Sequence, residues 1–256
     1  MRPIKYQTDA ERTQARVLYN QRHYQKRKAQ ALQASCVRIG DHVTLYHGDA
    51  RVIAPTLRGI HAVVSDPPYG RNFDFTKPRR SKHPLLPHRS AARWTRNIHG
   101  DDQPFDPAPW LGFPQVILWG ANHYASRLPD RPVWLTWDKR GDMTPDDHSD
   151  CEHAWTNLRG RAARLFTLKW RGVIREGEAN VSHRRKFHQA EKPIELMLWC
   201  VEKTQGVVLD PFMGSGSTLA ACVRLGRPCI GIEVHAEVFD KACKRLQSEV
   251  EKHAQA

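Results

Sequence analysis

The stretch Val207-Val208-Leu209-Asp210-Pro211-Phe212-Met213-Gly214-Ser215-Gly216-Ser217-Thr218 decides how this chain is expected to fold. Its first residues are apolar, as in a buried strand, and its two glycines permit a tight turn into a helix that begins near Ser217. A strand that passes through a glycine turn into a helix is typical of α/β sheets, which bind ligands at the carboxyl ends of their strands. Glu233 closes the next apolar segment, where a carboxylate can hold a ribose diol.

Apolar segments on either side of this stretch predict the rest of the sheet. The expected strands are residues 43–46, 61–65, 116–119, 133–137, 207–209 and 229–232. Helices are expected from Pro193, from Ser217 to Gly226, and from about residue 237. Nearly continuous apolar strands that alternate with helices indicate an α/β fold with a mostly parallel, doubly wound sheet.

The glycine turn differs from two common nucleotide sites. Leu219 stands where a dinucleotide site would have its third glycine, and no lysine follows the glycines as in a phosphate-binding P-loop. A ligand without a pyrophosphate, such as an adenosyl group, therefore fits this turn better. The alternative is an ordinary turn that binds no ligand.

A second motif, Asp66-Pro67-Pro68-Tyr69, follows the apolar segment 61–65. The Asp66 carboxylate and the Pro67 carbonyl can accept the two N–H bonds of an amine on an aromatic ring, which holds the nitrogen lone pair out of the ring plane. The prolines fix the backbone and donate no competing N–H. Tyr69 offers an aromatic face to a base that has left its helical stack. The alternative is a plain proline turn.

Length and composition limit the class of protein. With 256 residues, of which 40% are hydrophobic, the chain can bury the core of one α/β domain with insertions, and it is neither disordered nor fibrous. No apolar run approaches the roughly 20 residues that span a bilayer, and residues 1–12 lack the apolar core of a secretory signal. We therefore expect a cytoplasmic protein without a membrane partner.

The cysteines and histidines show no metal-binding or disulfide pattern. The six cysteines form no Cys-x-x-Cys pair, which favours reduced thiols. The fourteen histidines include no His-Glu-x-x-His pair, so no metal site is expected.

The charge is strongly positive. Lys and Arg number 40 against 27 Asp and Glu, which gives a net charge of +13 and favours a polyanionic partner. Thr8-Asp9-Ala10-Glu11 has the form of a capping box and predicts a basic helix to about Gln33, within an N-terminal arm of residues 1–40. This helix is either simply solvated or an arm that binds nucleic acid. Two further basic stretches, 71–109 and 141–191, interrupt the strand pattern.

Together the two motifs resemble the DNA amino-methyltransferase family, whose members transfer a methyl group from S-adenosylmethionine to an exocyclic amine of a base. Residues 66–69 are similar to the catalytic signature, residues 210–216 to the cofactor loop, and residues 191–196 to the segment before that loop. The catalytic motif comes first in the chain, as in the β class of the family. The resemblance covers about residues 44–246 and implies a Rossmann-like methyltransferase sheet with a permuted motif order and basic loop insertions.

The resemblance implies a role for each matching residue. The catalytic residues that bind the target base and its amine would be Asp66, Pro67, Pro68 and Tyr69. The residues that hold S-adenosylmethionine would be Asp49, Lys192, Asp210, Phe212, Gly214, Ser215, Gly216, Thr218 and Glu233. Glu233 is expected on the ribose hydroxyls, Lys192 near the methionine carboxylate and Asp49 on the adenine, although Asp49 can equally cap the following helix. Residues 137–139 also resemble a family segment, without an assigned role.

The implied reaction is direct in-line methyl transfer to N6 of adenine, in a base flipped out of a specific sequence of double-stranded DNA. Asp rather than Ser at position 66 favours adenine by resemblance. Methylation of cytosine N4, methylation of an RNA or protein amine, and a non-catalytic DNA-binding protein on the same scaffold stay open. A restriction-modification setting in a bacterial or phage-infected cell, and a monomer or homodimer, are expected.

DNA contacts are expected from the two basic stretches of a catalytic domain that spans residues 41–256. The candidates in the first stretch are Arg79, Arg80, Lys82, Arg89, Arg93 and Arg96. The candidates in the second stretch are Arg159, Arg161, Arg164, Lys169, Arg171, Arg184, Arg185 and Lys186. Sequence reading is expected in the second stretch, since it lies between the two motifs.

Overall fold

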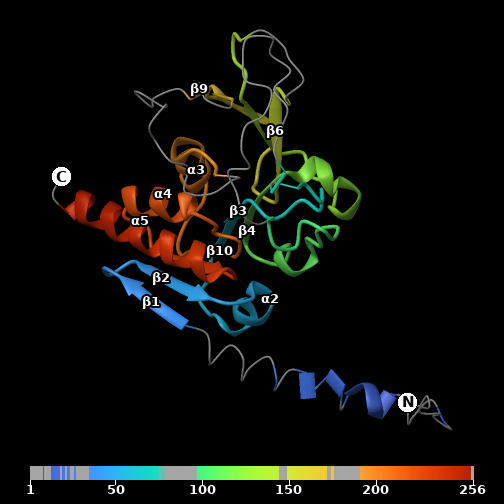
Figure 1. Cartoon of the computed structure of the whole chain (residues 1–256). Coiled ribbons are helices and arrows are strands. Elements are labelled where there is room, and N and C mark those ends of the chain that lie inside the picture. The colour runs from blue at the N-terminus through green and yellow to red at the C-terminus, as the bar shows by residue number, and fades with distance from the viewer. Residues whose placement is uncertain are drawn as a thin grey trace.

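Figure 1 shows a computed structural model of the chain. It describes residues 35–74, 76–77, 97–143, 149–171, 174–175 and 191–254, together with residues 8, 13–17, 19–20, 22–23 and 26. Of the N-terminal residues, 13–17, 19–20, 22–23 and 26 are helical, in agreement with the predicted basic helix. The rest of that predicted helix lies outside the described residues.

The described residues form one large sheet. Its strands are β1 (Ser35–Ile39), β2 (Val43–His47), β3 (Ala62–Ser65), β4 (Gln115–Trp119), β5 (Trp134–Asp138), β6 (Cys151–Thr156), β7 (Arg164–Thr167), β10 (Val208–Asp210) and β11 (Cys229–Glu233). They are ordered β1-β2-β11-β10-β3-β4-β6-β5-β7. Neighbours from β2 to β4 are parallel, as are β5 and β7, whereas β1 and β6 are antiparallel to their neighbours. A separate ribbon pairs β8 (Trp170–Arg171) with β9 (Ile174–Arg175).

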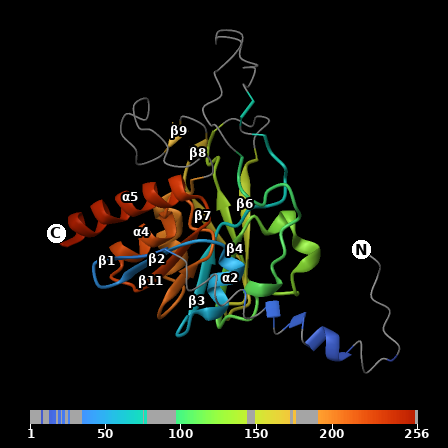
Figure 2. The ribbon, with the colours of Figure 1, turned by 60° about the horizontal axis from the view of Figure 1, so that its bottom comes forward.

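Helices cover one face of the sheet, and mainly short turns cover the other (Figures 1 and 2). The first face carries α3 (Ile194–Val201), α4 (Ser217–Arg224) and α5 (Ala236–Ala254). The second carries α2 (Ala50–Ile53) and the 3-10 turns η1 (Ala54–Thr56), η2 (Ala108–Trp110), η3 (Ala121–His123) and η4 (Ala125–Arg127). The mostly parallel α/β sheet confirms the predicted fold class.

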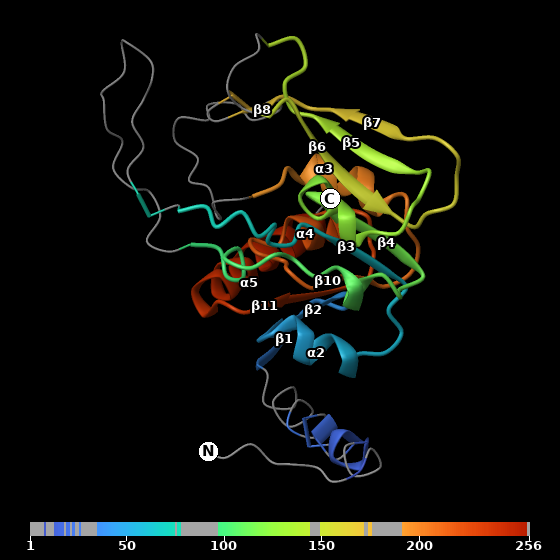
Figure 3. The same cartoon turned by 90° about the vertical axis from the view of Figure 1, so that its right-hand side faces the viewer.

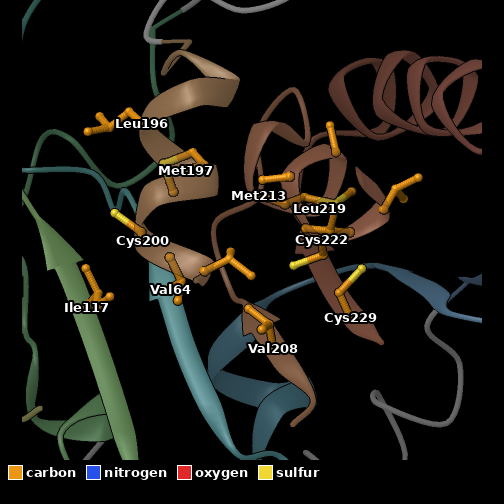
Figure 4. Close-up of a cluster of buried hydrophobic side chains, with 14 of the residues drawn as sticks. Val64, Ile117, Leu196, Met197, Cys200, Val208, Met213, Leu219, Cys222 and Cys229 are labelled. Atoms are coloured by element: carbon orange, nitrogen blue, oxygen red, sulfur yellow. The ribbon is translucent and has the colours of Figure 1, made fainter. Parts of the chain in front are cut away.

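Two cores result from the alternation of side chains along the buried strands. Val64 and Ile117 point into the core beneath the long helices, whereas Val63 and Leu118 point into the opposite core. Figure 4 shows part of the first core, with Met197 of α3 above the sheet. Because both faces are covered, the parallel strands are apolar throughout.

The predicted elements agree with this structure. The six predicted strands are β2, β3, β4, β5, β10 and β11, each within one residue of its predicted ends. The predicted helices correspond to α3, α4 and α5. Pro193 is the N-cap of α3 rather than its first residue.

Five strands occur where none was predicted: β1, β6 and β7 in the large sheet, and β8 and β9 in the separate ribbon. β1 lies within residues 1–40, the range assigned to the arm, and pairs with β2 across a tight turn at Gly40. The sheet therefore starts before the predicted boundary at residue 41. β6 and β7 lie within the basic stretch 141–191, and β6 is inserted between β4 and β5. That stretch therefore contributes sheet strands as well as loops.

The described residues contain no helix with the length and apolar character needed to cross a membrane. They also contain no group of three or more His, Cys, Asp or Glu side chains arranged to hold a metal ion. All six cysteines are free thiols.

Leu209 tests the packing of the second core. This residue of β10 is fully buried, so Leu209→Ala leaves a cavity and should lower the free energy of unfolding by about 2–5 kcal/mol. Leu165→Ala in the edge strand β7 is the control, because Leu165 is 64% exposed, and it should change that energy by less than about 0.5 kcal/mol. Urea unfolding measures both variants. Equal losses would contradict the described burial.

Candidate active site

Four carboxylates meet at the carboxyl ends of four neighbouring strands. Asp49 follows β2, Glu233 ends β11, Asp210 ends β10 and Asp66 follows β3. The four strands are parallel, in the order β2-β11-β10-β3, so these residues lie along one edge of the sheet. A pocket of about 1020 Å³ lies at this edge and is lined by all four.

Both sequence motifs line this pocket. The predicted site residues among the lining are Asp49, Asp66, Pro67, Pro68, Tyr69, Lys192, Asp210, Phe212, Gly214, Ser215, Thr218 and Glu233. Gly216 is the remaining predicted residue and is not part of the lining. It caps α4 with a φ of 80°, and a Cβ there would lie 3.2 Å from Leu246. Gly216 therefore turns the chain into α4 beside the pocket.

One hydrogen bond joins the two motifs. Ser65, the last residue of β3, donates from Oγ to Asp210 Oδ1 at 2.6 Å. Asp210 also accepts from the Phe212 backbone N–H at 3.1 Å. Burial raises the pKa of Asp210 to about 6, although hydrogen bonds from Ser65 and Thr218 oppose this rise. Asp210 thus fastens the start of the glycine turn to the strand that carries Asp66.

The other two carboxylates, Glu233 and Asp49, also accept hydrogen bonds from backbone N–H groups. Glu233 accepts from the Gly214 N–H at 3.1 Å and from the His235 N–H at 2.8 Å, and burial raises its pKa. Asp49 accepts from the Arg51 N–H at 2.8 Å and caps α2, as the alternative interpretation expects. Since Asp49 also lines the pocket, the cap and a ligand contact are compatible.

Lys192 lies at the centre of a group of polar side chains, called here the Asp66 corner, that also contains Asp66, Tyr69 and Glu152. Lys192 Nζ is 2.6 Å from Asp66 Oδ2, 3.0 Å from the Tyr69 hydroxyl and 3.1 Å from Glu152 Oε2. The Tyr69 hydroxyl donates to Asp66 Oδ1. Lys139 Nζ donates to Glu152 Oε1 at 2.7 Å. Lys192 is predicted near the methionine carboxylate of a cofactor, but its contacts lie at the catalytic motif.

Burial and the neighbouring charges shift the pKa values of Asp66, Glu152 and Lys192. Burial raises the pKa of Asp66, and Lys192 opposes this rise. Burial also acts on Glu152, yet Lys192 and Lys139 overcome it and lower its pKa to about 2. Burial lowers the pKa of Lys192, but the attraction of Asp66 and Glu152 outweighs it and leaves that pKa raised. Asp66 is therefore the weaker of the two acids, and Lys192 stays charged.

The ring of Tyr69 is held by packing. It stacks on His123, with ring centroids 5.0 Å apart and planes at 22°. The ring also lies against Gly120, which has a φ of 72° and where a Cβ would overlap the Tyr69 ring. Only a residue without a side chain therefore leaves room for the ring in this position.

Aromatic side chains form an apolar wall beside the glycine turn. Phe212 makes edge-to-face contacts with Trp110 and Phe105, at centroid distances of 5.3 Å and 5.7 Å. All three line the pocket. This wall offers contact area to a flat ring system.

The backbone that follows the catalytic motif wraps around a buried carboxylate. Asp101 accepts from the N–H groups of Gly70 at 3.0 Å, Arg71 at 3.2 Å and Phe73 at 3.1 Å. The Asn72 N–H donates to the Asp101 backbone oxygen at 2.6 Å. Asp101 thus ties residues 97–104 to the chain that carries Tyr69.

An arginine of α5 joins the glycine turn to the lysine segment. Arg245 Nη1 is 2.9 Å from Glu191 Oε1 and donates to the Ser215 backbone oxygen at 3.1 Å. The side chains of Arg245 and Glu191 are each 9% exposed. This ion pair therefore fixes the residue before Lys192 against the glycine turn.

The sequence interpretation missed Glu152, Lys139, Asp101 and Arg245. Lys139 belongs to the family-like segment 137–139, so that resemblance was a usable signal, and the structure shows that Lys139 contacts Glu152. Glu152, Asp101 and Arg245 belong to no recognised motif. Their contacts join residues far apart in the chain, and no local pattern marks them.

The structure places the described candidates for phosphate contact at two different edges of the sheet. β7 runs parallel to β5, whose carboxyl end reaches the pocket near Lys139. Figure 3 shows β5, β6 and β7 side by side. Arg164 begins β7, and a Cβ at Gly160 would lie 3.0 Å from Val133, which precedes β5. Because β7 begins at the edge of the sheet opposite the pocket, three candidates lie toward that edge and do not surround the pocket as predicted: Arg159, Arg161 and Arg164.

The remaining candidates divide in two. Lys169 follows the carboxyl end of β7, on the pocket side, and its Nζ lies 2.5 Å from Asp142. The candidates outside the described residues are Arg79, Arg80, Lys82, Arg89, Arg93, Arg96, Arg184, Arg185, Lys186 and the side chain of Arg171.

Sequence comparisons place part of this chain beside known DNA methylases. Residues 136–244 match the N6_N4_Mtase family, described as DNA methylase. The Type II methyltransferase M.ScaI of Streptomyces caespitosus is 35% identical over 81 residues, which are 30% of this chain and 27% of that protein. M.HindIII of Haemophilus influenzae is 40% identical over 68 residues, which are 25% of this chain and 22% of that protein. The matched segments thus span about a quarter of these relatives.

Solved structures are also similar to this chain. The crystal structure of the M1.HpyAVI-SAM complex is 24% identical, with a TM-score of 0.44, over 80% of this chain and 100% of that one. The PvuII DNA methyltransferase (cytosine-N4-specific) is 11% identical, with a TM-score of 0.49, over 85% of this chain and 94% of that one.

The parallel sheet and the acid-lined pocket at its carboxyl edge define an α/β protein with a candidate ligand site at the strand ends. Within this class, residues 136–244 are similar to DNA amino-methyltransferases, as their match to the DNA methylase family shows.

Gly120 tests how tightly Tyr69 is held. A methyl group at Gly120 overlaps the Tyr69 ring, so Gly120→Ala should lower the free energy of unfolding by about 1–3 kcal/mol more than a glycine substitution in open space. Gly59→Ala is the matched control, because Gly59 has a φ of 73° and no atom within 4 Å of a Cβ. Denaturant unfolding compares the two. Equal losses would mean that the ring moves aside at no cost.

Proposed function

We propose that this chain is a DNA methyltransferase that uses S-adenosylmethionine to methylate the exocyclic N6 of adenine in a specific DNA sequence. Its main support is that the Asp66 corner and the glycine turn line one pocket. The hydrogen bond of 2.6 Å between Ser65 and Asp210 joins the strands that carry them. A methyl donor bound at the turn and an amine bound at Asp66 would then be neighbours.

The residues around the glycine turn fit an adenosyl cofactor. The Glu233 and Asp49 carboxylates suit ribose hydroxyls and an adenine amine, and the wall of Phe212, Trp110 and Phe105 suits a purine ring. The turn carries no lysine that would favour a phosphate. S-adenosylmethionine would supply a methyl group on a positively charged sulfur and would leave as a neutral thioether.

Asp66 and Pro67 would orient the target amine. The Asp66 carboxylate and the Pro67 carbonyl accept its two N–H bonds, so that the nitrogen lone pair points out of the ring plane. Pro67 is buried and its backbone is fixed by the ring, which keeps this acceptor in place. Most of the rate would come from holding two reactants in this geometry.

Asp66 is also the group that would take the proton that the amine loses on methylation. Its pKa is raised by burial, whereas that of Glu152 is about 2, so Asp66 binds a proton more readily. Lys192, 2.6 Å from Asp66, keeps the carboxylate ionised before the reaction. Its contacts favour this role over the predicted one at the methionine carboxylate.

Adenine is the proposed target because residue 66 is Asp, which in the family resemblance accompanies N6 methylation. The amine of cytosine N4 would be held in the same way, so the product must be identified directly. Duplex DNA is incubated with the protein and methyl-labelled S-adenosylmethionine, digested to nucleosides and analysed by mass. We expect N6-methyladenine. N4-methylcytosine would exclude adenine as the target, and unmodified DNA with bound cofactor would indicate a non-catalytic DNA-binding protein.

Asp66→Ala should abolish methyl transfer while cofactor binding survives. Loss of the acceptor should reduce the single-turnover rate by at least about 100-fold, whereas the Kd for S-adenosylmethionine should change less than about two-fold. Asp240→Ala, at an exposed position of α5, is the control and should leave both quantities unchanged. Transfer at the wild-type rate by Asp66→Ala would remove Asp66 from the mechanism.

DNA binding should weaken as salt rises, because the net charge of +13 implies phosphate contacts. Arg71 is exposed at the rim of the pocket, so Arg71→Ala should reduce the slope of log affinity against log salt by about one. Arg161→Ala should leave the slope unchanged, since Arg161 lies at the opposite edge. Titrations with labelled duplex at several salt concentrations test this. An affinity independent of salt would contradict a DNA partner.

A further inference from the structure

Glu152 is a partly buried acid that shares Lys192 with Asp66, and the proposed reaction assigns it no part. It lies in β6, between β4 and β5, opposite Trp137 in the strand register. Each of its two carboxylate oxygens meets one ammonium group: Lys139 at 2.7 Å and Lys192 at 3.1 Å. Glu152 is therefore an ion-pair partner of the lysine that contacts Asp66.

We propose that Glu152 is a positioning residue that acts through Lys192 and sets the place and the charge of Asp66 in methyl transfer. This inference rests on the proposed function. Glu152 need not touch either substrate. It holds Lys192 from one side, so that the same ammonium can contact Asp66 and the Tyr69 hydroxyl on the other.

The geometry makes this chain of contacts specific. Lys192 directly precedes Pro193, whose ring fixes the backbone at the start of α3. Its side chain is 10% exposed, and the Glu152 side chain is 22% exposed. An ammonium with little access to water keeps its position only where carboxylates surround it. Without Glu152, Asp66 would be the one carboxylate among the described residues that forms an ion pair with Lys192.

The balance of charges around Lys192 also supports a positioning role for Glu152. Two lysines, Lys139 and Lys192, face two carboxylates, Glu152 and Asp66. Among the described residues, the other titratable groups that interact with them are Tyr69 on the chain after β3, His123 and Tyr124 on the chain after β4, and Asp210 at the end of β10. Glu152 raises the pKa of Lys192, so removing its charge should let Lys192 lose its proton at a lower pH. Glu152 itself raises the pKa of Asp66 whereas Lys192 lowers it, so the balance of these two charges contributes to the pKa of Asp66.

Glu152→Gln tests this inference, because it keeps the shape of the side chain and removes the charge. Single-turnover methyl transfer to duplex DNA should slow by about 100-fold, and the alkaline limb of the pH–rate profile should move to lower pH. The Kd for S-adenosylmethionine should stay within about two-fold. In the cofactor-free protein, the NMR-monitored pKa of Lys192 should fall. Glu195→Gln is the control: Glu195 is 53% exposed and 3.9 Å from Arg224, and all four quantities should stay unchanged.

A double-mutant cycle separates positioning from simple stabilisation of the fold. If Glu152 acts through Lys192, adding Glu152→Gln to Lys192→Gln should slow transfer by less than a further two-fold or so. Rate losses that multiply, or a slower rate without a shift of the alkaline limb, would overturn the inference. If Glu152→Gln does not fold, Glu152→Asp replaces it in the same cycle, since it keeps the charge but withdraws it from Lys192.

Measurement of the wild-type protein distinguishes failure of the proposed role of Glu152 from failure of the proposed function. Methyl transfer by the wild type together with an unaffected Glu152→Gln variant would overturn the role of Glu152 alone. Absence of transfer by the wild type under all conditions would overturn the proposed function, and the role of Glu152 with it.

Discussion

The hydrogen bond between Ser65 and Asp210 is the contact on which the site depends. It joins the ends of two parallel strands whose residues lie 145 positions apart in the chain. Each strand delivers one corner of the pocket: β3 leads into Asp66, and β10 leads into the glycine turn. The cost of burying Asp210 is visible in its raised pKa and is offset by three hydrogen bonds. Neither corner would face the other without this strand pairing.

Most of the fold could be predicted from the sequence, because its signals are local. Buried parallel strands are apolar throughout, and a glycine turn or a proline marks where a helix begins. β1 and β6 were missed because their residues are mixed in polarity, and pairing with a neighbouring strand decides their conformation. The direction of β6 and β7 also could not be predicted. That direction moves Arg159, Arg161 and Arg164 away from the pocket edge.

The candidate site shows the same division. Its motif residues lie where the sequence predicts, at the carboxyl ends of adjacent strands. The residues that hold them in place, Glu152, Arg245 and Asp101, belong to other elements and act over long sequence separations. Their contribution is electrostatic and depends on burial, which no short pattern encodes. Lys192 illustrates this limit. Its position in residues 191–196 predicts a place beside the glycine turn, whereas its ion-pair partners in the structure are Asp66 and Glu152.

The three backbone contacts of Asp101 have a consequence for how this protein can diversify. They bring the chain at Phe73 and the chain at Asp101 to the same point, so these two positions are held together as a closed stem. Lengthening a loop with closed ends costs only about 0.6 kcal/mol for each doubling. A change of length between these two positions would therefore cost little, as long as Asp101 keeps holding the chain that follows Tyr69.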